Sequence, residues 1–245
     1  MVKQAGRPSK KATSQSLVVR AYETIKERII SLHFLPGSYL NEATVCAQLG
    51  LSRTPVHQAL QRLSLEGLVE VLPRKGIVIR PDSISATLEI LDSRATVEPA
   101  LARKAAERVK NGEIDADQVE HVLRLATATD PKITPPDIAT FTFNDRAFHH
   151  EFAALSGNRT MCEFAQMLHE RSTRFWYLSM WQTVDVAESN AQHASIAKAI
   201  ASGDPEGAAA AAYSHINCLR DRLRRLRDMT PERTYLQRAE IPPHN

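Results

Sequence analysis

The stretch Leu51–Leu63 (LSRTPVHQALQRL) constrains the fold of this chain more than any other segment. Apolar residues recur in it at offsets of 0, 3, 4 and 7, a spacing that places them on one face of a helix. Ser52 precedes the first turn as a cap, and Pro55 is tolerated there because the first N–H groups of a helix lack intrahelical partners. The stretch therefore predicts a short helix with one buried face. The residues of that face are Val56, Ala59, Leu60 and Leu63.

The opposite face of this helix is polar and basic. Arg and Gln side chains can pair with the edges of bases when a helix lies in the major groove of DNA. We therefore expect this helix to contact a duplex. The residues expected to make the contacts are Arg53, Thr54, His57, Gln58, Gln61 and Arg62.

The distribution of charge supports a nucleic-acid module at one end of the chain. Residues 1–80 contain 12 Lys and Arg against 5 Asp and Glu, a net charge of +7. Residues 81–245 contain 19 against 23, a net charge of −4. A basic part joined to a mildly acidic part indicates a nucleic-acid-binding module fused to another domain.

The segment 16–80 is predicted to be a winged helix-turn-helix. A helical period runs from Ser16 to Ile30, a second short helix stops at Gly50, and two short strands, 69–71 and 77–80, follow the third helix. The loop between these strands has a basic tip at Arg74, Lys75 and Gly76, which either contacts phosphates or the minor groove as a wing or is a charged turn. Residues 1–15 are predicted to be a disordered basic tail, which either solubilises the protein or adds phosphate contacts.

The rest of the chain is predicted to be helical. After a linker at residues 81–84, residues 85–230 are expected to form an all-helical domain, and residues 231–245 a C-terminal tail. The expected fold class is thus mainly α, with an N-terminal winged helix-turn-helix and a C-terminal helical bundle that can enclose a ligand. The helices are expected near 84–110, 115–128, 136–156, 159–183, 185–202 and 204–228.

Two sets of motifs resemble known families. Pro36-Gly37-x-x-Leu40, LSRTPV at 51–56, Ala59-Leu60-x-Arg62-Leu63 and EGLV at 66–69 resemble the GntR family of bacterial regulators. The helical part resembles the FadR-type C-terminal domain, called FCD, and together the two cover residues 16–228. The resemblance implies a homodimeric regulator, which we expect to be a repressor, that binds a palindromic operator in double-stranded DNA and responds to a small organic acid. Most members carry Arg-Glu where this chain has His57-Gln58, which leaves the operator sequence and its pH dependence open.

Four residues of the helical part have side chains that bind metals. Asp145 and His149 are four residues apart and share a helix face, while His193 and His215 fall on two later helices. From spacing alone, each histidine is better explained by a structural role. The resemblance implies more, because metal-binding FCD domains place an Asp, a His four residues later and two further His on later helices. It implies a divalent ion such as Zn, Ni or Mn. Three other histidines are expected to lie outside this set: His121, His150 and His169.

Arg94 resembles the family arginine that faces the ligand cavity. A guanidinium there can bind the carboxylate of the effector through two hydrogen bonds. A salt bridge to Glu98, four residues later on the same helix, is an equally good interpretation. Trp176, Tyr177 and Trp181 either line the same pocket or belong to the core or a dimer interface.

Other classes of function remain as alternatives. The main one is a metal-dependent hydrolase or lyase with an N-terminal DNA anchor, since an ion with open positions can activate water. No general base can be assigned beside the four ligands, so we expect a regulator and not an enzyme. A cytoplasmic protein without membrane association is expected. The sequence has no apolar run long enough for a span, no signal-peptide core and three cysteines without a paired motif.

Overall fold

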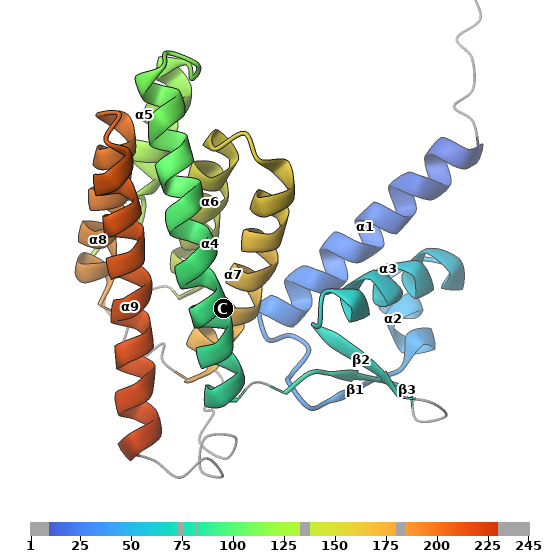
Figure 1. Cartoon of the computed structure of the whole chain (residues 1–245). Coiled ribbons are helices and arrows are strands. Elements are labelled where there is room, and N and C mark those ends of the chain that lie inside the picture. Colours follow the sequence, from blue (N-terminus) through green and yellow to red (C-terminus); the bar gives the residue numbers. More distant parts are fainter. Residues whose placement is uncertain (1–9, 73–75, 82, 133–137, 180–184, 230–245) are drawn as a thin grey trace, which may run out of the picture. The chain divides into compact units, whose positions relative to one another are not determined.

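The computed structural model describes residues 10–72, 76–81, 83–132, 138–179 and 185–229. The chain divides into two compact units, residues 1–81 and residues 82–245 (Figure 1). Each unit has an apolar core of its own. The boundary falls within the linker predicted at residues 81–84, and the first helix of the second unit begins at Ile84.

The first unit is a winged helix-turn-helix, as predicted. Its described elements are α1 (Lys10–Ile30), β1 (Tyr39–Leu40), α2 (Glu42–Leu49), α3 (Arg53–Leu65), β2 (Val69–Leu72) and β3 (Gly76–Ile79). The strands form an antiparallel sheet in the order β1-β3-β2. Leu40 pairs with Ile77, and Val71 pairs with the same residue from the other side. The sequence analysis missed β1, because a strand of two residues has no periodicity.

Two neighbouring helix starts are capped differently. Asn41 accepts hydrogen bonds from the backbone N–H groups of Ala43 and Thr44 at 2.9 and 3.3 Å, which fixes the start of α2. Gly50 ends that helix in the left-handed conformation, with φ of 62°, which a glycine adopts without strain. Ser52 occupies the cap position of α3, as expected, but its side chain makes no capping hydrogen bond.

The start of α1 corrects one predicted boundary. The helix begins at Lys10, whereas the sequence analysis expected disorder through residue 15. Lys, Ala and Gln are good helix formers, and no Gly or Pro stands between Lys10 and Ile30, so the helix extends toward the N-terminus at little cost. Residues 1–9 lie outside the described residues.

The core of the first unit joins its helices to its sheet. Ile25 and Ile29 of α1 meet the apolar face of α3, and all four residues predicted for that face are at most 1% exposed. Ile77 and Ile79 of β3 complete this core from the sheet side. Burial of these side chains fixes the orientation of α3, so its polar face must point outward.

The second unit is helical throughout its described parts. Its helices are α4 (Ile84–Lys110), α5 (Ala116–Leu125), α6 (Ile138–Leu155), α7 (Arg159–Ser179), α8 (Val186–Ala201) and α9 (Pro205–Met229). Helix α4 is the central element, since it packs against α6, α7, α8 and α9 (Figure 1). The six predicted helices are therefore present, with ends that differ by a few residues. The C-terminal tail expected at 231–245 lies outside the described residues.

Capping residues and glycines set the limits of these helices. Ser83 caps α4 by accepting from Ala86 N–H at 3.1 Å, and Asp185 caps α8 by accepting from Glu188 N–H at 2.9 Å. Gly157 lies between α6 and α7 with φ of 71°, and a Cβ there would come within 2.8 Å of Arg108. Among the described residues, no helix is long and apolar enough to cross a membrane.

Candidate DNA-binding helix and buried metal centre

The polar face of α3 is exposed, as the sequence predicted. The side chains of Arg53 and His57 are 85% and 54% exposed. Both are linked to Glu42 at the start of α2, with Arg53 Nε 3.3 Å from Oε1 and His57 Nδ1 3.4 Å from Oε2. Glu42 thus holds two neighbouring side chains at the start of α3. Thr54, Gln58 and Gln61 are exposed on the same helix.

Arg62 also has a role inside the winged helix. Its guanidinium carbon lies 3.7 Å from the centre of the Tyr22 ring, and its Nε donates to Glu66 Oε1 at 3.1 Å. Glu66 in turn accepts from the Tyr22 hydroxyl at 2.8 Å. Arg62 therefore connects α3 to α1, a contact that the sequence analysis did not foresee. Its side chain is still 57% exposed, so its predicted contact with DNA stays a prediction.

The predicted basic wing is described only in part. Gly76 begins β3 with φ of 98°, which suits a glycine at the edge of a hairpin loop. Arg74 and Lys75 lie outside the described residues.

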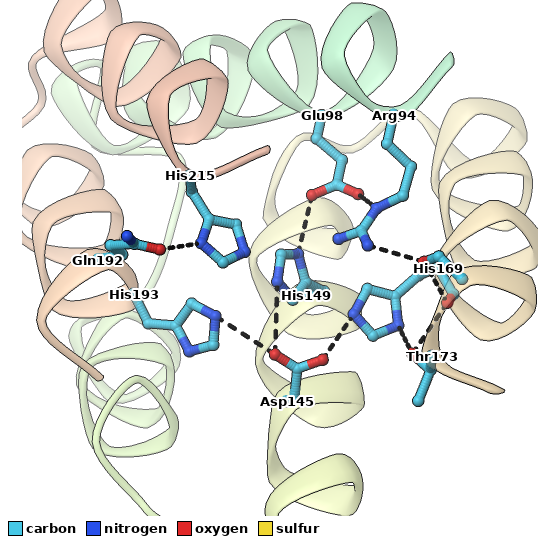
Figure 2. Close-up of polar contacts among 10 residues, drawn as sticks. Arg94, Glu98, Asp145, His149, His169, Thr173, Gln192, His193 and His215 are labelled. Carbon is cyan, nitrogen blue, oxygen red and sulfur yellow. Dashed lines mark hydrogen bonds and ion pairs between the residues drawn. The ribbon is translucent and has the colours of Figure 1, made fainter. Parts of the chain in front are cut away.

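The second unit brings the carboxylate of Asp145, whose side chain is 17% exposed, together with four buried imidazoles (Figure 2). Asp145 and His149 come from α6, His193 from α8 and His215 from α9, as the sequence analysis expected. Asp145 Oδ1 lies 3.3 Å from His193 Nε2 and 3.9 Å from His149 Nε2. The rings of His193 and His215 have centroids 4.8 Å apart. Ligand atoms of His149, His193 and His215 all lie within 4.8 Å of one another.

His169 of α7 was expected outside the ligand set, and the structure brings it next to Asp145, a contact that the sequence analysis did not foresee. It is buried, and its Nε2 lies 2.9 Å from Asp145 Oδ2. Asp145, His149 and His169 form a second group whose ligand atoms lie within 4.8 Å of one another. His169 and Asp145 lie on different helices, so no helical spacing relates them in the sequence. Only the packing of α7 against α6 brings the two together. His121 and His150, by contrast, are outside both groups.

Two hydrogen bonds, one buried and one partly buried, orient the rings. Glu98 Oε2 lies 2.8 Å from His149 Nδ1, and Gln192 Oε1 lies 2.8 Å from His215 Nδ1. Because carboxylate and amide oxygens accept, each Nδ1 donates, and the Nε2 of each ring keeps a free electron pair toward the cluster. Partners of this kind fix the tautomer of histidines that bind metals.

The electrostatics of the cluster favour the forms that bind cations. Burial lowers the pKa of His193 to about 3, and burial with the positive charge of Arg94 lowers the pKa of His169 to about 4. Burial alone would raise the pKa of Asp145, but the neighbouring histidines outweigh it and hold that pKa well below its ordinary value. His169, His193 and His215, whose pKa values burial lowers, are thus uncharged near neutral pH and Asp145 is ionised, as metal binding requires.

A pocket lined in part by Asp145 and His215 adjoins this cluster. Arg94 lines it, but this arginine is also paired, since its Nε donates to Glu98 Oε1 at 2.5 Å and its Nη1 donates to Ser172 Oγ at 2.9 Å. Both interpretations of Arg94 therefore have support, because the salt bridge exists and Nη2 is buried without a hydrogen bond among the described residues. Trp176 lines the pocket as well, and its Nε1 also makes no hydrogen bond among the described residues. Trp181 and the side chain of Tyr177 lie outside what the structure describes.

A winged helix joined to a helical domain defines a DNA-binding transcriptional regulator, and the comparisons with known proteins name its family. Residues 17–79 match the model of bacterial regulatory proteins of the gntR family, and residues 89–217 match the FCD domain. The chain belongs to the GntR family of bacterial regulatory proteins, with an FCD domain as its second part. The family consists of regulators and not of enzymes, which removes the hydrolase or lyase alternative.

Individual relatives agree with this assignment. The Nta operon transcriptional regulator of Aminobacter aminovorans is 29% identical over 76% of this chain and 85% of its own length. The gluconate operon transcriptional repressor of Bacillus subtilis is 28% identical over 58% of this chain and 56% of its own length. The solved structure of Escherichia coli McbR/YncC has the same fold, with a TM-score of 0.71, 19% identity, and coverage of 86% of this chain and 98% of that one.

Proposed function

We propose that this regulator is a homodimeric repressor that releases a palindromic operator when a small organic acid binds beside a divalent ion in the helical unit. The observation that carries the proposal is the pair of buried nitrogens, His149 Nε2 and His193 Nε2, which make no hydrogen bond among the described residues. A buried polar atom without a partner is costly, and a cation would satisfy both. The gluconate operon repressor among the relatives supports the sign of regulation.

The donor set fits a divalent metal. Asp145, His149, His193 and His215 would hold the ion, which is one carboxylate oxygen and three imidazole nitrogens, a combination that suits Zn, Ni or Mn. Glu98 and Gln192 orient two of the rings before any ion binds. An ion held there supplies a positive charge with open positions for a carboxylate. The chain's own part is to present four donors, three of them on buried imidazoles.

The pocket beside the cluster fits the acid. Two residues that line it, Arg94 and Trp176, have N–H donors, at Nη2 and Nε1, without a hydrogen bond among the described residues. Arg94 uses its Nε–H and one hydrogen of Nη1 within the protein, so one hydrogen of Nη1 and both of Nη2 are left for the carboxylate, and the predicted two-bond contact stays a prediction. Arg222 lines the same pocket while bonded to Glu188 at 2.8 Å. The site thus selects an anionic ligand through a few directed donors.

In the proposed mechanism, two α3 helices of a dimer read the two halves of the operator through Arg53, Thr54, His57, Gln58 and Gln61, in the cytoplasm of a bacterium. Phosphate contacts from Arg74, Lys75 and the backbone of Gly76 would add affinity without sequence preference. The acid can weaken this binding only if it binds better to an arrangement of the dimer that does not match the operator.

The experiment combines metal analysis with an operator assay on the intact chain. Replacing both His193 and His215 by Ala should reduce the metal content from stoichiometric to background, as measured by elemental analysis. The same variant should bind the operator without responding to organic acids in a gel-shift titration. His121→Ala, which changes an exposed histidine, is the matched control and should retain both properties. Full metal content in the double variant would refute the site.

A further inference from the structure

His169 is the one imidazole of the cluster that the proposed four-ligand set does not use. It belongs to α7, it is 3% exposed, and its ring centroid lies 4.5 Å from that of His149. Its Nε2 faces Asp145 Oδ2, while Oδ1 of the same carboxylate faces His193 and His149 (Figure 2). The two oxygens of Asp145 are thus already divided between different neighbours.

The hydrogen bonds around His169 indicate which ring nitrogen carries the proton. Its Nδ1 lies 3.2 Å from Thr173 Oγ1. The Thr173 hydroxyl is also 2.9 Å from the carbonyl oxygen of His169, but that oxygen accepts from Ser172 Oγ at 2.9 Å as well. Ser172 Oγ accepts from Arg94 Nη1, so the hydrogen of the Ser172 hydroxyl must point to the carbonyl.

Because Ser172 already donates a hydrogen bond to the carbonyl oxygen of His169, the Thr173 hydroxyl is available to donate to His169 Nδ1. The neutral ring then carries its hydrogen on Nε2, where it meets the ionised Asp145 Oδ2 at 2.9 Å. The opposite tautomer would place a bare electron pair of Nε2 against a carboxylate oxygen, which is repulsive. Both contacts of the ring are satisfied only when Nε2 donates.

We propose that His169 is a positioning residue for the metal centre: it holds Asp145 Oδ2 by a hydrogen bond and leaves Oδ1 as the single carboxylate oxygen for the ion. The inference rests on the proposed metal site and goes beyond it. A carboxylate held in this way binds through one oxygen, and a ring that donates to it is not itself a ligand. The ion therefore keeps the open positions that an acid effector needs.

The test uses Co²⁺ alone as the probe and the full-length, metal-free chain. Affinity is measured by competition with a chelator, and the visible absorption of bound Co²⁺ reports the ligand set. His169→Ala should weaken Co²⁺ binding about 10–100-fold, the range found for residues that orient metal ligands. His169→Gln should recover most of the affinity, because its amide N–H can still donate to Asp145. Both variants at saturation should keep the wild-type absorption.

Three results would overturn the proposal. Unchanged affinity in His169→Ala shows that the contact does not position Asp145. A Gln variant as weak as the Ala variant, with altered absorption, shows that His169 is itself a ligand. A wild-type chain that binds no Co²⁺ refutes the metal site and this inference together, whereas the first two results leave the site standing. Far-UV circular dichroism checks folding, and His169→Leu replaces the Ala variant if that variant does not fold.

Discussion

The two units of this regulator place their polar side chains in opposite ways. In the winged helix, Arg53 and His57 are exposed and the core beneath them is almost entirely apolar. In the helical unit, Glu98, His149 and their neighbours lie in the interior, where each group depends on another for its charge or hydrogen bonds. A surface that meets DNA can be changed one residue at a time, whereas a buried cluster responds as a whole.

Glu98→Ala should give the largest loss of stability. The change leaves Arg94 buried without its carboxylate and His149 without its acceptor, and breaking a buried ion pair costs about 3–5 kcal/mol. Urea denaturation of the metal-free protein measures the loss. Glu107→Ala on the same helix is the control, because the Glu107 side chain is 40% exposed and pairs with Lys104 at the surface. Equal stability of the two variants would show that the interior pairs of Glu98 contribute no more than a surface pair.

Acidification should destabilise the helical unit more than the winged helix. In the folded chain the pKa values of His193 and His169 are about 3 and about 4, below the ordinary value of 6.5. Between pH 6.5 and these folded values, the unfolded chain therefore binds more protons than the folded chain. Stability therefore falls as the pH drops below about 6.5, by up to about 1.4 kcal/mol per pH unit for each imidazole. Glu98 and Asp145, whose pKa values are also lowered, act in the same direction at lower pH.

Amide hydrogen exchange of the metal-free chain, corrected for intrinsic rates, separates the two units in this experiment. Protection in α6 and α8 should fall between pH 6.5 and 5, while protection in α3 should change less, because His33 and His57 of the winged helix are exposed. An equal loss of protection in both units would show that the buried imidazoles do not govern the acid response.

Arg53→Ala should weaken operator binding by about 1–3 kcal/mol, the usual value of a good contact to a base edge. The side chain is exposed at the start of α3, so its loss should leave folding intact. Gel-shift titration at a fixed salt concentration measures the effect. Arg124→Ala on α5 removes the same charge from an exposed position far along the chain and should have no effect. Similar losses in both variants would indicate a general effect of charge.

The smallest expected effect separates two capping residues of the winged helix. Asn41→Ala should destabilise the protein by about 1 kcal/mol, since it removes the acceptor for two N–H groups of α2. Ser52→Ala should cost clearly less, because the Ser52 side chain makes no capping bond. Urea denaturation of the two variants side by side tests the difference, and equal losses would mean that Ser52 caps α3 in solution.

The features that depend on residues close together in the sequence were predicted well. The buried face of α3, the stop at Gly50 and the pair Asp145 and His149 all follow from helical spacing or from the conformational freedom of glycine. The link between Arg94 and Glu98 was one of two interpretations for the same reason, since the two residues are four apart.

What the sequence did not reveal depends on packing between distant segments. His169 meets Asp145 because α7 lies against α6, and no spacing encodes that contact. Arg62 stacks on Tyr22 only because α1 crosses α3. The strand Tyr39–Leu40 exists because β3 offers it a partner, since its own two residues carry no pattern. In each case the deciding information is the tertiary arrangement.

The part of α4 that precedes Pro99 gives the second unit a long helical arm. The helix runs from Ile84 to Lys110, and Glu98 stands just before Pro99, which removes one intrahelical hydrogen bond, with Ile84 about 21 Å away along the axis. Glu98 accepts from His149 on α6, so a shift of that ring would tilt the helical segment from Ile84 to Glu98. A tilt of a few degrees about Glu98 would displace Ile84 by roughly 1 Å, on the scale of helix shifts in allosteric proteins. Ile84 follows closely, along the chain, on the boundary between the two units.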